Sequence, residues 1–335
     1  MPDGAFERLL ITGATGFVGS AVLRQLAAGE YLLGAVASGG RTAAAPPAVR
    51  LLARSIPADR SAAPAGEWRA ADLDDPASLR GCCDGVDTVL HLASRIGGDP
   101  ELCRRTNVLG TEALLAEAGR AGVRRIVYLS TAAVYGDGPH RGQAERGLVP
   151  CPVSATSSTR LAAEAPVLAR GGTVVRPHLV HGPGDRWVLP GIVDLVRRVR
   201  AWPEGGRART SMIAVEDLGR ALLALALAPD APAAGEVLHA VHPEPVRVRE
   251  LISQVCSMLG APLPEVELTE AQLQAALTAT GSSPGDRRPA LLCRDRWYDG
   301  TELWRRTGLT PGPGFAARLA EHAAGYRAEP QVLPV

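Results

Sequence analysis

A glycine-rich segment near the amino terminus, TGATGFVG at residues 12–19, constrains the fold of this chain more than any other feature. It follows a short apolar run and precedes an amphipathic one, so a tight turn should join a strand to a helix. In such a turn Gly13 permits the bend, Gly16 lets backbone approach a pyrophosphate, and Gly19 lets the helix pack closely. The amino terminus of the helix then faces the anion, so the segment predicts a dinucleotide site.

The rest of the first half alternates short β-rich runs with longer Ala- and Leu-rich runs at helical spacing. This alternation is typical of a doubly wound α/β fold, in which helices cover both faces of a parallel sheet. The predicted strands are residues 8–12, 31–37, 88–93, 126–130 and 173–175, and the predicted helices are residues 18–28, 107–121 and 158–169.

The character of the sequence changes after Pro177 to segments rich in Gly, Pro and Arg. Such segments are typical of loops and short helices that carry a binding site. We therefore predict a dinucleotide-binding domain over residues 1–175 and a smaller, mainly substrate-binding domain over residues 176–330. Residues 211–240 are expected to return to the first domain.

Composition excludes several classes of function. The formal net charge is +1 and no apolar run is long enough to span a bilayer, so we expect a soluble protein that binds neither nucleic acid nor membranes. All 36 cationic residues are arginine, which removes every mechanism that needs a lysine. The six cysteines lack the spacing of a zinc site, and the chain begins without a signal-like segment. We expect a cytoplasmic protein without a bound metal.

The end of the second predicted strand bears on the choice of dinucleotide. An NAD-binding protein usually places an acid there, against the ribose hydroxyls, but this segment reads VASGGRTA. Ser38 and Arg41 could instead bind the 2′-phosphate of NADP, because a guanidinium matches a phosphate in charge and geometry. The segment favours NADPH over NADH, and the alternative is that Arg41 only solvates a loop.

Several further motifs follow in order: ADLDD, HLAS, NVLGT, YLSTAAVYG, VVRPHLVHGPG and IAVEDL. Together with TGATGFVG they resemble the extended short-chain dehydrogenase/reductases of the NAD-dependent epimerase/dehydratase group, over about residues 6–326. The resemblance implies a Rossmann-type fold with a smaller carboxyl-terminal substrate domain, and a homodimer that forms through the helices at 107–121 and 158–169. The cofactor-binding residues expected from all these features are Gly13, Thr15, Gly16, Phe17, Val18, Gly19, Ser38, Arg41, Asp72, Leu73, Leu92, Ala93, Ser94, Asn107 and Arg160.

The resemblance breaks at the catalytic residues. The family binds the substrate oxygen with a Ser or Thr, which Thr131 matches, and donates a proton from the Tyr of a YxxxK motif. In the matching segment, SATSSTRLAAE, Thr156 stands at the Tyr position and Arg160 at the Lys position. A threonine lacks the acidity of a phenol and a guanidinium keeps its proton, so neither can serve as an ordinary general acid or base. Arg160 could still bind the ribose and stabilise negative charge.

The proton for a reduction must then come from elsewhere. Among the protein groups, Tyr135, His178 and His181 are candidates, although each also has an ordinary structural interpretation. Ser94 is expected to face the cofactor or the substrate. The other source of the proton is the substrate itself, if its ketone lies next to a hydrogen-bonded phenol, as in hydroxylated anthraquinone-like polyketides.

These features resemble the atypical ketoreductases of aromatic-polyketide biosynthesis. We expect an NADPH-dependent enzyme that reduces a polycyclic aromatic, angucyclinone-like ketone in the formation of an antibiotic. Two alternatives stay open. One is a sugar-nucleotide epimerase, dehydratase or reductase, whose reactions need the proton transfer that the missing Tyr performs. The other is a catalytically inactive sensor or scaffold that binds NADP.

Overall fold

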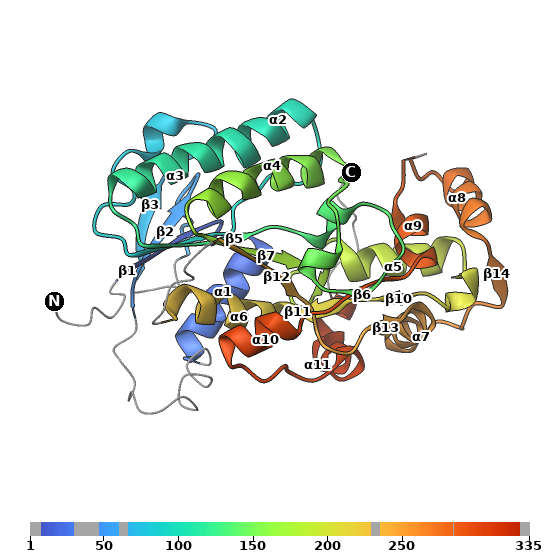
Figure 1. The fold of residues 1–335 in the computed structure, drawn as a ribbon. Coiled ribbons are helices and arrows are strands. Elements are labelled where there is room, and N and C mark those ends of the chain that lie inside the picture. Colours follow the sequence, from blue (N-terminus) through green and yellow to red (C-terminus); the bar gives the residue numbers. More distant parts are fainter. Residues whose placement is uncertain (1–7, 30–46, 60–65, 229–234, 284, 329–335) are drawn as a thin grey trace.

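A computed structural model describes residues 8–29, 47–59, 66–228, 235–283 and 285–328, and its centre is a seven-stranded parallel sheet (Figure 1). The strand order is β12-β7-β5-β4-β1-β2-β3, so the direction of winding reverses between β1 and β4. The strands are β1 (Arg8–Thr12), β2 (Ala48–Ala53), β3 (Glu67–Ala70), β4 (Thr88–His91), β5 (Arg125–Leu129), β7 (Thr173–Pro177) and β12 (Glu236–Ala240). The predicted doubly wound α/β fold is confirmed.

Helices cover both faces of this sheet, which is why its inner strands are apolar at successive positions. Leu9, Leu10 and Ile11 of β1 are all fully buried, and neighbouring residues of the strand contribute to apolar clusters on opposite faces. On one face lie α1 (Phe17–Ala28), α6 (Val215–Leu227) and α10 (Thr301–Thr307), and on the other α2 (Pro100–Arg104), α3 (Gly110–Arg120) and α4 (Ala155–Ala169).

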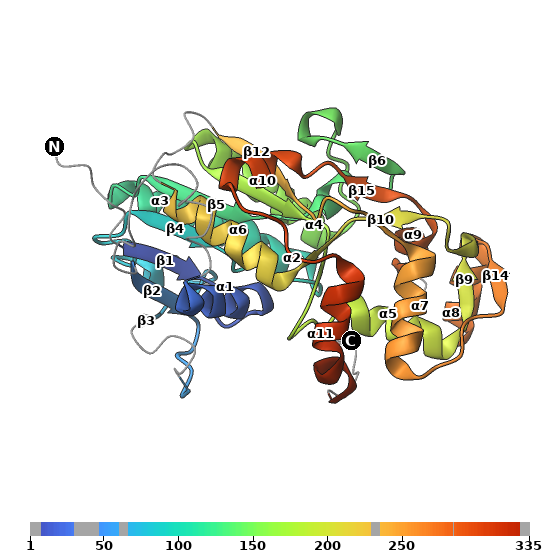
Figure 2. The same cartoon turned by 90° about the horizontal axis from the view of Figure 1, so that it is seen from below.

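A smaller part of the chain lies beyond the carboxyl ends of the large sheet (Figure 2). It has its own apolar cluster, to which α5, α7, α8 and α11 contribute, among them the buried Leu195, Leu251 and Leu273. Its strands are β6 (His140–Gln143), β8 (Leu179–His181), β9 (Ala201–Pro203), β10 (Arg209–Thr210), β11 (Met212–Ala214), β13 (Val246–Arg247), β14 (Val266–Leu268) and β15 (Arg296–Tyr298). Its helices are α5 (Val188–Arg198), α7 (Val248–Leu259), α8 (Glu270–Ala279), α9 (Arg288–Cys293) and α11 (Phe315–Ala328).

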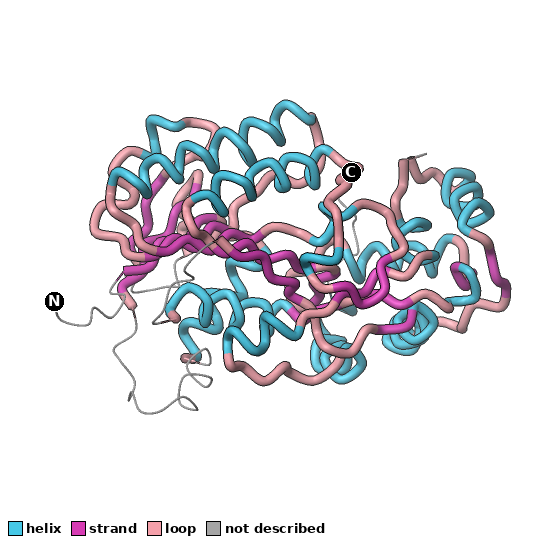
Figure 3. Tube along the Cα trace, viewed as in Figure 1, coloured by secondary structure: helices cyan, strands magenta, loops and turns pink. Residues whose placement is uncertain are grey.

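Short helical turns connect several of these elements. They are η3 (Pro76–Leu79), the π-helical turn η4 (Arg105–Leu109), η5 (Ala132–Tyr135), η6 (Glu145–Gly147) and η7 (Glu204–Gly206). In Figure 3 most strands of the two parts follow one another in a band with helices above and below it, while β14 lies apart at the far end of the smaller part. None of the helices within the described ranges has the length and apolar character needed to cross a bilayer.

The observed elements differ from the predicted ones chiefly at the second strand. The predicted strand at residues 31–37 lies outside the described residues. The second position of the sheet is occupied by β2 at Ala48–Ala53, which the sequence analysis did not identify. Residues 211–240 contain β12, which pairs with β7 in the large sheet. The predicted helix at 107–121 begins instead within the π-helical turn η4 and continues as α3.

Candidate active site

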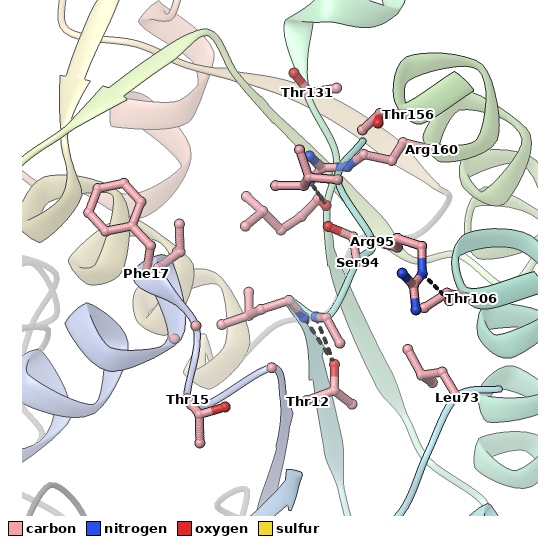
Figure 4. Close-up of a pocket in the computed structure, with 18 of the residues that line it drawn as sticks. Thr12, Thr15, Phe17, Leu73, Ser94, Arg95, Thr106, Thr131, Thr156 and Arg160 are labelled. Carbon is pink, nitrogen blue, oxygen red and sulfur yellow. Dashed lines mark hydrogen bonds between the residues drawn. The ribbon is translucent and has the colours of Figure 1, made fainter. Parts of the chain in front are cut away.

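A cavity of about 800 Å³ opens at the carboxyl edge of the large sheet, beside the reversal point between β1 and β4. Doubly wound folds bind their ligands in this crevice. Side chains from both parts of the chain line it, and Figure 4 shows several of those that the large-sheet part contributes. Of the residues predicted from the sequence, the cavity lining contains Gly13, Thr15, Gly16, Phe17, Val18, Gly19, Asp72, Leu73, Leu92, Ala93, Ser94, Thr131, Thr156, Arg160 and His178.

The glycine turn has the close backbone approaches that its sequence predicts. Gly13 has φ of 68°, and a β-carbon on it would lie 2.7 Å from the backbone nitrogen of Ala93. A β-carbon on Gly19 would lie 2.1 Å from the carbonyl oxygen of Gly13, so only glycine lets α1 begin this close to the turn. Helix α1 starts at Phe17 without a side-chain cap. Its first N–H groups are therefore available to an anion, as a pyrophosphate requires.

Arg54 lies where a dinucleotide-binding fold selects its cofactor. It follows the last residue of β2, is exposed, and lines the cavity. This is the position at which an arginine can accommodate a 2′-phosphate. Ser38 and Arg41, predicted for this role, lie outside the described residues. The sequence analysis missed Arg54 because it did not identify β2, and the signal that could have indicated this strand is the apolar run Leu51 to Ala53 before Arg54.

A buried hydrogen-bonded chain holds the ends of β1 and β4 together under the cavity. The Thr12 hydroxyl accepts hydrogen bonds from the N–H groups of Leu92 and Ala93, each at 3.1 Å, so its own proton is donated to Nδ1 of His91 at 2.6 Å. On the other side, Nε2 of His91 lies 2.9 Å from the hydroxyl of Thr111. Burial lowers the pKa of His91 to about 3, so the ring stays neutral. Sequence reasoning did not identify this support.

Thr131 is placed at the cavity by the start of η5. Its hydroxyl oxygen accepts a hydrogen bond of 3.1 Å from the N–H of Ala133 and so caps this short helix. The hydroxyl proton is not used by that contact and can be donated toward the cavity. This geometry allows Thr131 to hydrogen-bond a carbonyl oxygen of a bound ligand.

Thr156 and Arg160 lie side by side in the lining, on successive turns of α4, but both are bonded to backbone. The hydroxyl of Thr156 accepts a hydrogen bond of 2.9 Å from the N–H of Gly97. Arg160 is buried, and one of its terminal nitrogens donates to the carbonyls of Leu129 and Ser130 at 2.6 and 2.9 Å. The guanidinium therefore contributes a fixed positive charge at the wall, and neither side chain provides an acidic proton.

Tyr135 is directed away from the cavity. Its phenol oxygen accepts a hydrogen bond from Arg176 at 2.7 Å and lies 2.7 Å from Nε2 of His239, to which it donates. Burial raises the pKa of Tyr135, and its side chain is not part of the cavity lining. Its proton is committed to a buried network that also contains Glu164, paired with Arg176.

The two predicted histidines differ in position. His178 lines the cavity, its ring packs edge-on against Tyr298, and its Nε2 is buried without a hydrogen-bond partner among the described residues. Burial lowers the pKa of His178 to about 3, so it is neutral near pH 7. His181 does not line the cavity; it packs against Phe315 of α11, and burial lowers its pKa to about 4.

Asn107 supports the site indirectly. Its amide oxygen accepts from the N–H of Arg95 at 2.7 Å, and its amide nitrogen donates to the carbonyl of Arg95 at 3.0 Å. Asn107 does not itself line the cavity, but it fixes the loop that follows β4. Among the residues that the structure describes, no group of three His, Cys, Asp or Glu side chains is arranged to hold a metal ion.

The fold, the glycine turn and the cavity together define a protein of the Rossmann-type dinucleotide-binding class. Residues 9–240 match the NAD dependent epimerase/dehydratase family, and the chain belongs to this family. It is an NAD(P)-dependent oxidoreductase.

Two curated relatives cover most of the chain. The 2-alkyl-3-oxoalkanoate reductase of Stenotrophomonas maltophilia is 28% identical over 330 residues, which are 91% of this chain and 94% of the relative. The 4-hydroxy-2-methyl-3-oxo-4-farnesyl-3,4-dihydroquinoline-1-oxide ketoreductase of Stigmatella aurantiaca is 31% identical over 304 residues, 85% of this chain and 84% of the relative. Among solved structures, a dTDP-glucose 4,6-dehydratase of Streptomyces venezuelae with NAD bound has a TM-score of 0.72 at 25% identity, covering 96% of this chain and 97% of that one.

Proposed function

We propose that this protein is an NADPH-dependent ketoreductase whose substrate, a polycyclic aromatic ketone, supplies the proton. The observation that carries the proposal is the state of Thr156 and Arg160, which stand where the family has Tyr and Lys and are bonded to backbone in the wall of the cavity that also contains the glycine turn. The names of the two curated relatives, both reductases of oxo compounds, support reduction of a ketone.

The choice of NADPH rests on Arg54. Its guanidinium stands at the end of β2, and no acid follows that strand in the segment ARS to repel a 2′-phosphate. The glycine turn and the uncapped start of α1 would hold the pyrophosphate, and Leu73 would lie against the adenine. When bound there, the cofactor supplies a hydride equivalent.

The remaining residues orient the ketone and stabilise charge. Thr131 donates a hydrogen bond to the carbonyl oxygen, and Arg160 provides positive charge near the oxygen as it becomes negative. A phenol hydrogen-bonded to the same oxygen gives it a proton as the carbonyl carbon accepts the hydride, and the resulting phenolate regains a proton from water. Alignment of the reacting groups can account for about 7–11 kcal/mol of the barrier.

The mouth of the cavity supports a flat apolar substrate. Ile96, in the loop after β4, is 54% exposed, and Trp187, before α5, is 48% exposed, and both line the cavity. Large apolar side chains exposed at a cavity are typical of a ligand contact. An aromatic ring system between them would cover both, as an angucyclinone-like polyketide in an antibiotic pathway would.

The decisive experiment measures NADPH consumption with two matched polycyclic ketones, one with a phenol hydrogen-bonded to the carbonyl and one with that hydroxyl methylated. Turnover of the phenol alone is expected. Equal turnover of both ketones would refute the role of the phenol and mean that the proton comes from the protein or from water. Binding of NADPH without reduction of either ketone would favour the two alternatives described next.

A sugar-nucleotide epimerase or dehydratase is the second candidate, because the solved structures of similar fold include a dTDP-glucose 4,6-dehydratase. It predicts that denaturing the purified protein releases tightly bound NAD(H). An inactive sensor is the third, and it predicts tight NADP binding, no turnover and a stable partner protein.

We also propose a cytoplasmic homodimer that forms through α3 and α4. Ala162 and Ala165 of α4 are exposed and available to such an interface, whereas Ala163 is buried within the chain, and light scattering of the purified protein tests the dimer.

A further inference from the structure

The carboxyl-terminal helix α11 is bonded to the loop between β8 and α5, which forms part of the cavity wall (Figure 2). The phenol of Tyr326 donates a hydrogen bond to the carbonyl oxygen of Gly182 at 2.9 Å and accepts one from the N–H of the same residue at 2.7 Å. Tyr326 is only 5% exposed. One hydroxyl group therefore satisfies both backbone groups of a residue in the wall.

The backbone at Gly182 passes close to the start of α6, where only glycine fits. Its φ is 136°, a region that favours glycine, and a β-carbon on it would lie 2.7 Å from a side-chain methyl group of Val215. The next residues, Pro183 and Gly184, lead directly to Asp185. The position of Gly182 thus sets where the cavity-lining part of the loop begins.

Asp185 connects this turn to the residues at the mouth of the cavity. It is 2% exposed, lies beside the Tyr326 phenol, and its carboxylate accepts hydrogen bonds from the N–H groups of Trp187, Val188 and Leu189 at 2.8 to 2.9 Å. These bonds cap the first turn of α5. Both Asp185 and Trp187 line the cavity, so the phenol of Tyr326 is connected to Trp187 through a single carboxylate.

Helix α11 does not depend on the Tyr326 hydroxyl for its own attachment. Its His322 lies 3.1 Å from the carboxylate of Glu216 at the start of α6, and its Phe315 packs against His181. Leu319 is buried in the apolar cluster of the smaller part. Removal of the hydroxyl alone should therefore leave the helix in place and alter only the loop.

We propose that Tyr326 is a positioning residue for substrate binding: its hydroxyl fixes the Gly182–Asp185 turn, and Asp185 in turn holds Trp187 at the mouth of the cavity. The functional half of this proposal rests on the proposed function, because it makes Trp187 a contact of the ketone. Cofactor binding depends on the glycine turn and on Arg54, so the Kd for NADPH should not change.

The test compares Tyr326→Phe with Gly325→Ala. The first keeps the ring and removes the hydroxyl, whereas the second adds a methyl group where nothing lies within 4 Å, on the neighbouring residue of the same helix. Amide hydrogen exchange of the peptide covering residues 182–189 is the first readout, and the expected result is faster exchange at residues 187–189 in Tyr326→Phe alone. The KM for the phenolic ketone is the second, and it should rise about tenfold, with the Kd for NADPH unchanged.

Each result bears on a different claim. Unchanged exchange at residues 187–189 would overturn the proposal whatever the substrate is. Faster exchange that extends to the glycine turn at residues 12–19 would overturn it as well, because the hydroxyl would then be a general stabiliser. Faster local exchange with an unchanged KM would refute the link to the substrate. If wild-type protein reduces no ketone, the proposed function fails, while the exchange measurement still decides the role of Tyr326.

Discussion

Arg54 offers the sharpest test of the cofactor end of the site. Replacing it by alanine removes the cation that follows β2 and leaves the buried part of that strand unchanged. A hydrogen bond to a charged group contributes about 1.5–3 kcal/mol, and the lower end applies here because Arg54 is exposed. We therefore expect the Kd for NADPH to rise about tenfold, while the Kd for NADH, which lacks the 2′-phosphate, stays the same.

Calorimetric titration of the purified protein with NADPH and with NADH measures the two Kd values. Arg24→Ala is the matched control, because Arg24 is exposed on α1 and does not line the cavity. Arg41→Ala should be compared directly, since the sequence alone favoured that residue. Equal weakening of NADPH and NADH in Arg54→Ala would refute the reasoning, and selective loss of NADPH in Arg41→Ala alone would return the phosphate site to Arg41.

Three further predictions concern the chemistry and its support. The double variant Thr156→Tyr with Arg160→Lys should not speed reduction of the phenolic ketone, and a large rise in kcat with that ketone would contradict a substrate-derived proton. Tyr135→Phe should leave kcat unchanged but lower the free energy of unfolding in urea by about 1–3 kcal/mol, because Arg176 and His239 each lose a buried partner. Since the pKa of His91 is lowered to about 3, its unfolded form binds more protons between about pH 6.5 and 3. Stability should therefore fall on acidification through that range, by up to about 1.4 kcal/mol per pH unit for this residue, and His91→Gln should flatten the dependence.

The sequence predicted the large sheet well where strands are buried on both faces. The runs at β1, β4 and β5 each have consecutive buried apolar residues at their centre, and such runs are recognisable without their neighbours. β2 and β3 were missed. In β2 the charged Arg50 lies between Val49 and Leu51, and its burial depends on hydrogen bonds to the carbonyls of Cys82 and Asp84 and to the carboxylate of Glu67. A buried arginine whose partners lie in other segments cannot be recognised from its own segment.

The residues of the candidate site show the same difference between features that the local segment determines and features that depend on other segments. Positions fixed by local turn geometry, such as Gly13 and Gly19, could be predicted because their sequence spacing alone implies the close contacts. The roles of Tyr135 and Asn107 could not, since they depend on partners distant in the sequence, His239 and Arg95 respectively. Tyr135 belongs to the same motif as Thr131, yet its hydroxyl is hydrogen-bonded to Arg176 and His239, which do not line the cavity.

The exposed mouth of the cavity separates the three candidate functions. Ile96 and Trp187 keep about half of their surface in water, and complete burial of such side chains contributes about 1.5–3 kcal/mol each. Half of that, about 2 kcal/mol for the pair, is gained only when an apolar ligand covers both. A sensor that binds the dinucleotide alone, at the glycine turn, leaves this surface exposed, and the hydroxyl-rich ring of a sugar nucleotide covers it poorly. A flat aromatic ketone gains the whole amount. Since Tyr326 and Asp185 hold Trp187 in place before any ligand arrives, little ordering of the wall is needed on binding, and the gain appears as affinity for the ketone.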